Sequence, residues 1–277
     1  MSPEAAIADL VAGRLAERAS GDPPLVLGLC GAQGSGKSTV AARLAQRFER
    51  SAILSLDDLY LTRAERERLA YEVHPLLATR GVPGTHDVAL GAATLAAIAR
   101  GEPAPLPRFD KATDDRLPRG RWPSAPERTE LVVFEGWCVG ARPQAEASLA
   151  APLNGLEAEE DAEGRWRRYA NAALATDYAQ LFEHVDLLAL TIPPDWSTVL
   201  RWRIEQEEGL RRARGGGAGV MDDAQVERFV AHYERLTRHI WSEMPTRADL
   251  CLRLDEHRNV ASVKAVSPFG DGSAKLT

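Results

Sequence analysis

Residues 28–48, GLCGAQGSGKSTVAARLAQRF, constrain the fold of this chain more than any other segment. They contain the pattern G-x-x-x-x-G-K-S, whose glycines let the backbone curve around phosphate oxygens because no Cβ is in the way. The apolar residues 25–30 before the pattern predict a buried strand, and the amphipathic residues from about Lys37 onward predict a helix. A helix that begins at such a loop directs its dipole and its unpaired N–H groups at one point, so the segment predicts a bound phosphate.

The residues of this loop have distinct expected roles. Lys37 is expected to reach the β- and γ-phosphates of a nucleotide as a point charge, and the Ser38 hydroxyl is expected to bind Mg²⁺. The pattern therefore implies ATP and Mg²⁺ as cofactors. The alternative is a chance glycine-rich turn, against which the flanking strand and helix both argue. The expected nucleotide-binding residues are Gly31, Ala32, Gln33, Gly34, Ser35, Gly36, Lys37, Ser38 and Thr39.

Four later segments also contain short apolar runs that predict strands. They lie within residues 51–61, 129–140, 185–194 and 248–256. Long helical segments separate the last three of them. Short apolar strands that alternate with helices predict an α/β fold, because a parallel sheet is covered by helices on both faces. We therefore expect a P-loop NTPase fold with a parallel five-stranded sheet flanked by helices.

Two acidic residues occupy positions that phosphoryl transfer requires. Asp57 follows the second predicted strand, and Glu135 ends the third in the run LVVFEG. Ligands of α/β sheets bind at the carboxyl ends of the strands, and the chemistry needs a positioned metal and a group that orients or deprotonates the attacking oxygen. We expect Glu135 to contact Mg²⁺ directly or through water. The alternatives are a helix N-cap for Asp57 or Asp58, and a solvated strand end for Glu135.

An arginine-rich segment, WRIEQEEGLRRARGGGAGVM, precedes the last predicted strand. A helix that carries arginines and ends in a glycine run is typical of a lid that covers phosphates and excludes water during transfer. We expect such a helical, Arg-rich lid at about residues 197–220. The alternative is a solvated helix in which glutamates at positions 205, 207 and 208 pair with the arginines.

Composition excludes several classes of protein. The formal net charge of −6 argues against nucleic acid as a partner, because binding to a phosphate backbone needs a basic surface. No segment approaches the roughly 18 apolar residues of a membrane span, and the acidic, amphipathic N-terminus argues against a signal peptide. Three cysteines without C-x-x-C spacing are typical of buried thiols in a reducing compartment. We expect a cytoplasmic protein with a small-molecule substrate and no membrane partner.

Several of these motifs together resemble one known family. The phosphate loop is followed by SLDDLYL, TRGVPGTHD, PRFDKATDDR, LVVFEGWCVG and an Arg-rich helix ahead of HYERLTR. In this order they resemble the D-glycerate 3-kinases of plants and fungi and their bacterial relatives, which belong with uridine kinase, phosphoribulokinase and the bacterial-type pantothenate kinase among the P-loop kinases. The resemblance covers roughly residues 24–255. Its most specific parts are RGVPGTHD, FDKATDDR and FEGWCVG.

The resemblance implies a role for each matching residue. Asp57 would be the catalytic base that faces the acceptor hydroxyl, and Glu135 would hold Mg²⁺ together with Ser38. Lys37 would act in catalysis with the lid arginines Arg201 and Arg203. The acceptor site would be lined by Arg80, His86, Asp87, Arg108, Asp110 and Lys111.

The implied organisation is a single P-loop kinase domain over residues 1–277. It would comprise an N-terminal helix at 1–20, a core at 24–255 that includes the lid, and a C-terminal tail at 267–277.

The acceptor can also be considered from its chemistry. Glycerate is a small carboxylate with two hydroxyls, so its site should be small and cationic. The run PRFDKATDDR supplies Arg108, Lys111 and Arg116, together with aspartates that could bind hydroxyls. The alternative for this run is a solvated loop with internal ion pairs. We therefore expect ATP-dependent transfer of the γ-phosphoryl group to a hydroxyl of D-glycerate, which would give 3-phosphoglycerate.

Two rival functions stay open. One is the same chemistry on another acceptor, such as uridine or pantothenate. A nucleoside site would need a stacking aromatic, for which Phe109, Trp122 and Trp137 are available. The other rival is a nucleotide-binding regulatory protein with slow hydrolysis, which would have no use for a base aimed at an acceptor pocket.

Overall fold

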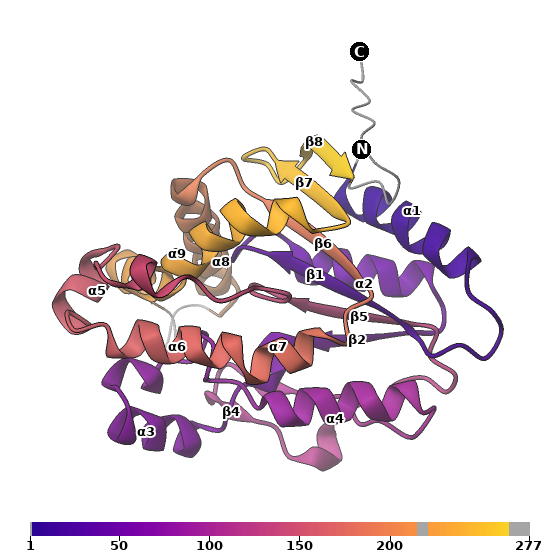
Figure 1. The fold of residues 1–277 in the computed structure, drawn as a ribbon, viewed down its shortest axis with the longest axis horizontal. Helices are drawn as coiled ribbons and strands as arrows, with labels where there is room; N and C mark the ends of the chain where they lie inside the picture. The colour runs from indigo at the N-terminus through magenta and orange to yellow at the C-terminus, as the bar shows by residue number, and fades with distance from the viewer. Residues whose placement is uncertain (1, 215–220, 266–277) are drawn as a thin grey trace.

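The computed structural model describes residues 2–214 and 221–265. Within these residues a six-stranded sheet has the order β2-β5-β1-β6-β7-β8 (Figure 1). Its strands are β1 (Leu25–Gly31), β2 (Ser51–Ser55), β5 (Leu131–Gly136), β6 (Leu187–Ile192), β7 (Leu250–Leu254) and β8 (Val260–Ala265). All neighbours from β2 to β7 pair in parallel, which confirms the predicted five-stranded parallel sheet.

The edge strand β8 was not predicted from the sequence. It pairs antiparallel with β7, and most of its residues are exposed. An exposed edge strand needs no continuous apolar run, so its sequence, VASVKA, lacks the signal that identified the other five.

Helices cover both faces of the sheet. The helices of the described residues are α1 (Pro3–Ala16), α2 (Lys37–Arg47), α3 (Arg63–Glu72), α4 (Val88–Ala99), α5 (Gly155–Glu160), α6 (Arg165–Ala175), α7 (Asp177–Phe182), α8 (Trp196–Arg214) and α9 (Asp223–Glu243). Of these, α3 and α5 pack in a separate cluster away from the sheet. Figure 1 shows α1 and α4 on opposite sides of the strands. No helix among the described residues is long and apolar enough to cross a membrane.

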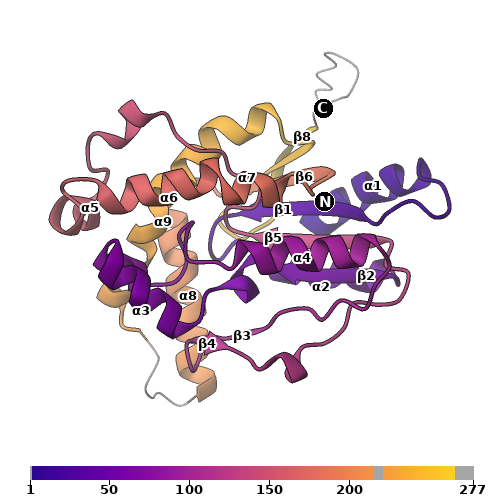
Figure 2. The same cartoon turned by 60° about the horizontal axis from the view of Figure 1, so that its bottom comes forward.

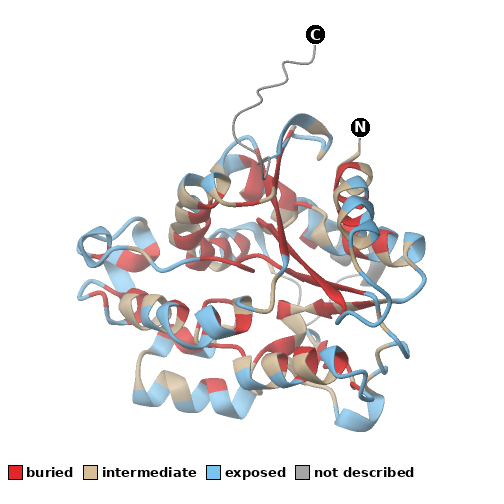
Figure 3. Ribbon diagram, turned by 45° about the vertical axis from the view of Figure 1, so that its right-hand side comes forward, coloured by how far each residue is buried: buried red, intermediate tan, exposed pale blue. Residues whose placement is uncertain are grey.

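Alternating strand residues supply two hydrophobic layers. Leu25, Leu27 and Leu29 of β1 pack with α1, α2 and the Trp202 side chain of α8. Their neighbours Val26 and Cys30 pack into the other layer, with residues of α4, α7 and α9. The central strands are therefore buried on both sides, as the run of buried residues in Figure 3 shows.

Three features meet at the carboxyl edge of this sheet. The phosphate loop follows β1, Glu135 lies near the end of β5, and the short 3₁₀ helix Leu56–Leu59 follows β2 directly. The parallel register places Ser55 opposite Glu135. A small hairpin, β3 (Phe109–Asp110) and β4 (Asp115–Arg116), lies apart from the main sheet (Figure 2). The edge brings together residues that are distant in the sequence.

Candidate active site

A cleft of about 370 Å³ lies at the carboxyl edge of the sheet. It is lined by Gln33, Gly34, Lys37, Ser38, Asp57, Tyr60, Arg80, Lys111, Glu135, Trp137, Arg203, Gln206, Phe229 and Tyr233. A larger groove of about 760 Å³ lies between α5, α8 and α9, but it contains none of the predicted site residues. The smaller cleft is therefore the candidate active site.

The phosphate loop forms one wall of this cleft. Helix α2 begins at Lys37, whose Nζ donates a hydrogen bond to the Ala32 carbonyl at 3.0 Å. Gly34 has φ +74°, and a Cβ there would lie 2.6 Å from Cβ of Trp202, so only glycine fits between the loop and α8. The sequence thus folds locally into the strand, glycine loop and helix that its pattern predicted.

Glu135 and Ser38 lie next to one another in the cleft. The Ser38 hydroxyl donates to Oε1 of Glu135 at 3.1 Å, and the Ser55 hydroxyl donates to the same oxygen at 2.8 Å. A buried carboxylate beside a hydroxyl is a hard oxygen pair that fits Mg²⁺. The described residues contain no cluster of three or more His, Cys, Asp or Glu side chains that could hold a metal.

Asp57 lies on the 3₁₀ helix after β2 and faces into the cleft. Its Oδ1 accepts a hydrogen bond from the Tyr60 hydroxyl at 2.8 Å, and its Oδ2 accepts one from Lys111 Nζ at 2.6 Å. Burial alone would raise the pKa of Asp57, but the Lys111 ammonium, the Tyr60 hydroxyl and the charge of Lys37 together hold it well below its usual range. Asp57 is therefore an ionised carboxylate beside the phosphate loop.

Asp58 has a different environment. It accepts hydrogen bonds from the Phe109 backbone N–H at 2.9 Å and from Arg108 Nη1 at 3.3 Å. Burial raises its pKa. The N-cap alternative does not describe either aspartate, because Thr62 caps the next helix, α3. Asp58 holds the β3–β4 hairpin against the end of β2.

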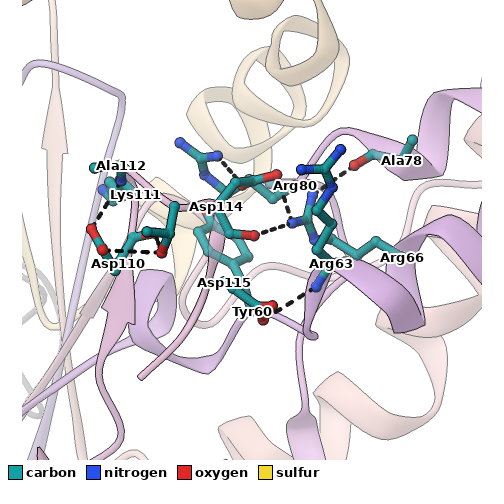
Figure 4. A network of polar contacts seen from close by, with 12 residues as sticks. Tyr60, Arg63, Arg66, Ala78, Arg80, Asp110, Lys111, Ala112, Asp114 and Asp115 are labelled. Carbon is teal, nitrogen blue, oxygen red and sulfur yellow. Dashed lines mark hydrogen bonds and ion pairs between the residues drawn. The ribbon is translucent and has the colours of Figure 1, made fainter. Parts of the chain in front are cut away.

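The hairpin is also tied down near its turn (Figure 4). Asp114 accepts a hydrogen bond from Arg66 Nη2 at 2.8 Å and forms an ion pair with Arg80. The guanidinium of Arg80 lies 5.7 Å from the centre of the Phe109 ring. These contacts fix Arg80 at the cleft and hold the turn that carries Lys111.

Aromatic side chains close the far side of the cleft. Trp137 donates its Nε1 hydrogen to the Gly81 carbonyl at 2.9 Å, and the Tyr233 hydroxyl donates to the Arg80 carbonyl at 3.1 Å. The two rings meet edge to face, with their centres 4.8 Å apart. Arg203 of α8 forms an ion pair with Glu207 at 2.7 Å and lies 5.6 Å from the centre of the Phe229 ring.

The structure does not bring every predicted residue into the cleft lining. His86 is buried beneath Tyr60, with its ring centre 4.7 Å away, and burial lowers its pKa to about 3, so it is neutral. Asp87 caps α4 by accepting from the Leu90 N–H at 3.0 Å. Both residues shape the wall behind Tyr60.

Three other predicted residues also point elsewhere. Arg108 contacts Asp58 as described above, and Asp110 accepts the Ala112 N–H at 2.9 Å within the hairpin turn. Arg201 lies 3.4 Å from Glu256, near the β7–β8 turn, although the neighbouring Arg203 faces the cleft. The predicted lid covers α8 as far as Arg214, but residues 215–220 and the tail 267–277 lie outside the described residues.

Tyr60, Gln206, Phe229 and Tyr233 line the cleft but were not identified from the sequence. Tyr60 stands three residues after Asp57, within hydrogen-bonding reach, and this spacing could have identified it. Phe229 and Tyr233 are four residues apart on α9, which is also the usual spacing of helix core residues. Nothing local distinguishes these two residues from an ordinary buried stripe.

Known proteins are similar to this chain in sequence and in fold, although no protein-family model matches it. The uncharacterized kinase mug58 of Schizosaccharomyces pombe is 36% identical over 229 residues, which span 76% of this chain and 78% of the relative. The chloroplastic D-glycerate 3-kinase of Arabidopsis thaliana is 30% identical over 259 residues, which span 86% of this chain and 54% of the plant protein. The structure of D-glycerate 3-kinase from Cryptococcus neoformans var. grubii matches with a TM-score of 0.78 and 27% identity, over 95% of this chain and 99% of that one.

The similarity extends over most of this chain, and the shared fold includes the sheet edge that carries the phosphate loop. The chain is therefore a P-loop kinase that belongs to the D-glycerate 3-kinase family.

Proposed function

We propose that this kinase transfers the γ-phosphoryl group of ATP to a hydroxyl of D-glycerate and produces 3-phosphoglycerate. One observation carries the proposal: Asp57 lies in the same small cleft as Lys37 and three further cations, Arg80, Lys111 and Arg203. A base beside a phosphate loop suits transfer to an alcohol, and the cations suit an acceptor that is itself an anion.

Each residue of the cleft has a part in the proposed reaction. Lys37 and the loop N–H groups would hold the β- and γ-phosphates, and Arg203 would approach them from α8. Ser38 and Glu135 would hold Mg²⁺, which when bound offsets negative charge on the phosphate oxygens. Asp57 would accept the proton of the attacking hydroxyl, while that oxygen bonds to the γ-phosphorus and ADP leaves.

The acceptor carboxylate would lie between Arg80 and Lys111. Both side chains line the cleft. Asp58 holds the hairpin that carries Lys111, and Asp114 of the same hairpin pairs with Arg80. Lys37 of the phosphate loop would bind ATP, while Arg80 and Lys111 would bind the acid.

A nucleoside acceptor has less support than an acid. Trp137 is only 4% exposed and Tyr233 only 2% exposed. The two rings pack against each other, and the Tyr233 ring also packs against Phe229. Neither ring offers an open face on which a base could stack. A regulatory protein with slow hydrolysis also has less support, because Asp57 faces a cleft lined by cations that water would not require. A cytoplasmic location remains a prediction.

A coupled assay of ADP release tests the proposal. D-glycerate, L-glycerate, uridine, pantothenate and a sample without acceptor would be compared with the purified protein. We expect release well above the acceptor-free rate with D-glycerate alone. Release with uridine but not D-glycerate would contradict the substrate while leaving the kinase assignment intact.

A charge reversal in the cleft tests the acid-binding end. Lys111→Glu should raise the KM for D-glycerate at least about tenfold, because it places a carboxylate next to the carboxylate of the acceptor. The KM for ATP should change little, since Lys37 and the loop hold the phosphates. Lys264→Glu, on the exposed edge strand β8, is the matched control and should leave both constants unchanged. An unchanged KM for D-glycerate in Lys111→Glu would remove this residue from the acceptor site.

A further inference from the structure

We propose that Lys111 makes the base at Asp57 available only when an anionic acceptor is bound. In the empty cleft the Lys111 ammonium occupies the carboxylate that would take the acceptor's proton, and the carboxylate of an acceptor draws it away. Lys111 is thereby a positioning residue that determines specificity. This inference rests on the proposed function, because it concerns the control of the same site.

The geometry of the pair supports this role. Lys111 Nζ lies 2.6 Å from Oδ2 of Asp57, although the two residues are 54 positions apart in the chain. Among the contacts of the described residues, Lys111 has no other hydrogen bond or ion pair, and its side chain is 59% exposed. The ammonium can therefore leave Asp57 by rotation of its own side chain, without breaking any further contact.

The other cleft cations are held in a different way. Arg80 pairs with Asp114, and Arg203 pairs with Glu207 and lies over the Phe229 ring. Neither makes a contact with Asp57 in the described structure. Of the cations that line the acceptor end, Lys111 is thus the one that both neutralises the base and can move.

The backbone that carries Lys111 need not move. The hairpin stem is fixed by the Phe109 N–H on Asp58, and by the ion pair of Arg116 with Asp87 at 3.0 Å. Lys111 lies in the turn beyond this stem, on the edge of the cleft. A long, flexible side chain on a fixed turn can exchange one carboxylate partner for another.

The exchange has a chemical consequence. An ammonium at hydrogen-bonding distance lowers the affinity of a carboxylate for a proton, so the paired Asp57 is a poor base. An acceptor carboxylate within reach of Lys111 competes with Asp57 for the Lys111 ammonium. When the ammonium moves to the acceptor, the proton affinity of Asp57 is restored. Without an acceptor, water is the only nucleophile: its oxygen would bond to the γ-phosphorus, the bond to the bridging oxygen would break, ADP would leave, and the proton would have to pass to Asp57. The pair therefore suppresses this wasteful hydrolysis of ATP.

A binding experiment without nucleotide tests the competition directly. Calorimetric titration with D-glycerate would compare the wild type, Asp57→Asn, Lys111→Met and the double variant. Asp57→Asn should bind D-glycerate about two- to fivefold more tightly, the scale of an exposed ion pair, because Lys111 is no longer occupied. In the Lys111→Met background the same change should give no such gain. An equal gain in both backgrounds would show simple repulsion by Asp57 and would overturn the inference.

Hydrolysis without any acceptor tests the consequence independently of the substrate's identity. Lys111→Met should release ADP at least about tenfold faster than the wild type. This increase is smaller than the full rate gain from a positioned general base, which is about 10²–10⁴-fold. Lys111→Arg should restore the suppression, and the double variant with Asp57→Asn should lose the increase. Lys264→Met is the control. An unchanged rate in Lys111→Met would overturn the inference even if D-glycerate is the substrate, whereas failure of D-glycerate alone would contradict only the proposed function.

Discussion

The two ends of the cleft are built in different ways. The phosphate end, residues 31–39 with Glu135, is formed largely by the backbone of one continuous segment between β1 and α2. The acceptor end is formed by side chains of Asp57, Arg80, Lys111 and Tyr233, which belong to four separate segments. Backbone on a rigid strand and helix tolerates little change, whereas side-chain contacts can change one substitution at a time. Under the proposed function, the phosphate end would fix the type of reaction, and the acceptor end would leave the substrate open to variation.

The largest effect should come from the phosphate end. Lys37→Ala should lower phosphoryl transfer by about 10³-fold or more, the scale of a cation that acts on transferring phosphate. The fold should survive, because the Lys37 ammonium contacts only the Ala32 carbonyl among the described residues. Steady-state kinetics and a thermal melt, with Lys264→Ala as control, would measure both. A variant with wild-type turnover would contradict the assignment of the phosphate end.

The second-largest effect should come from the base at the acceptor end. Asp57→Asn should lower kcat by about 10²–10⁴-fold while the KM for ATP stays nearly the same, because only the proton acceptor is lost. Asp9→Asn, an exposed aspartate on α1, is the matched control. A small loss in Asp57→Asn beside a large loss in Asp58→Asn would show that the two aspartates have each other's roles.

The pH profile of the wild type follows from the same carboxylate. The pKa of Asp57 is lowered, so the group stays ionised as the pH falls through the range in which an ordinary carboxyl is protonated, near pH ~4. The profile of kcat/KM, which reports the enzyme before the acceptor binds, should therefore show no acid limb assignable to Asp57 above this range. Lys111→Met removes the main cause of the low pKa, so its acid limb should move to higher pH. An acid limb at the same pH in both proteins would contradict the assigned cause.

A moderate effect should arise where the hairpin is anchored. Asp58→Ala leaves the Phe109 N–H without its acceptor, which costs about 1–3 kcal/mol, and removes the contact with Arg108. Because the hairpin carries Lys111, the KM for the acceptor should rise about tenfold, corresponding to ~1.4 kcal/mol, with little change in the KM for ATP. Equal changes in both constants would show that the two ends are not independent.

The smallest effect should come from the partner of the base. Tyr60→Phe keeps the ring on His86 and removes only the hydroxyl that donates to Asp57. A hydrogen bond is worth about 1 kcal/mol net, so kcat should fall about fivefold. Tyr71→Phe is the control, since Tyr71 is 93% exposed. A fall as large as that of Asp57→Asn would mean that Tyr60 takes part in proton transfer itself.

The same difference between the ends explains what the sequence could predict. The loop between β1 and α2 could be predicted because its residues are contiguous and follow one recognisable spacing. The parallel strands could be predicted because burial on both faces requires continuous apolar runs. Edge strand β8 has no such requirement, since most of its residues are exposed.

The acceptor end depends on contacts that no local pattern contains. The Tyr233 hydroxyl meets the Arg80 carbonyl across 153 positions of the chain. His86 is a polar residue in a promising motif, yet it packs beneath Tyr60 as a neutral, buried ring. Only the folded chain distinguishes a residue that faces the cleft from one that supports it.

The anchored β3–β4 hairpin has a consequence for protein engineering. Defined contacts join it to the remainder of the chain, and the partners there are Asp57, Asp58, Tyr60, Arg63, Arg66, Arg80 and Asp87. A segment attached in this way can be exchanged as a unit, provided that the graft keeps partners for these anchors. Libraries that vary only residues 110–113 would therefore sample new acceptors on an unchanged ATP-binding scaffold. Under the proposed function, a change of acceptor would then need four replaced residues rather than the redesign of a domain.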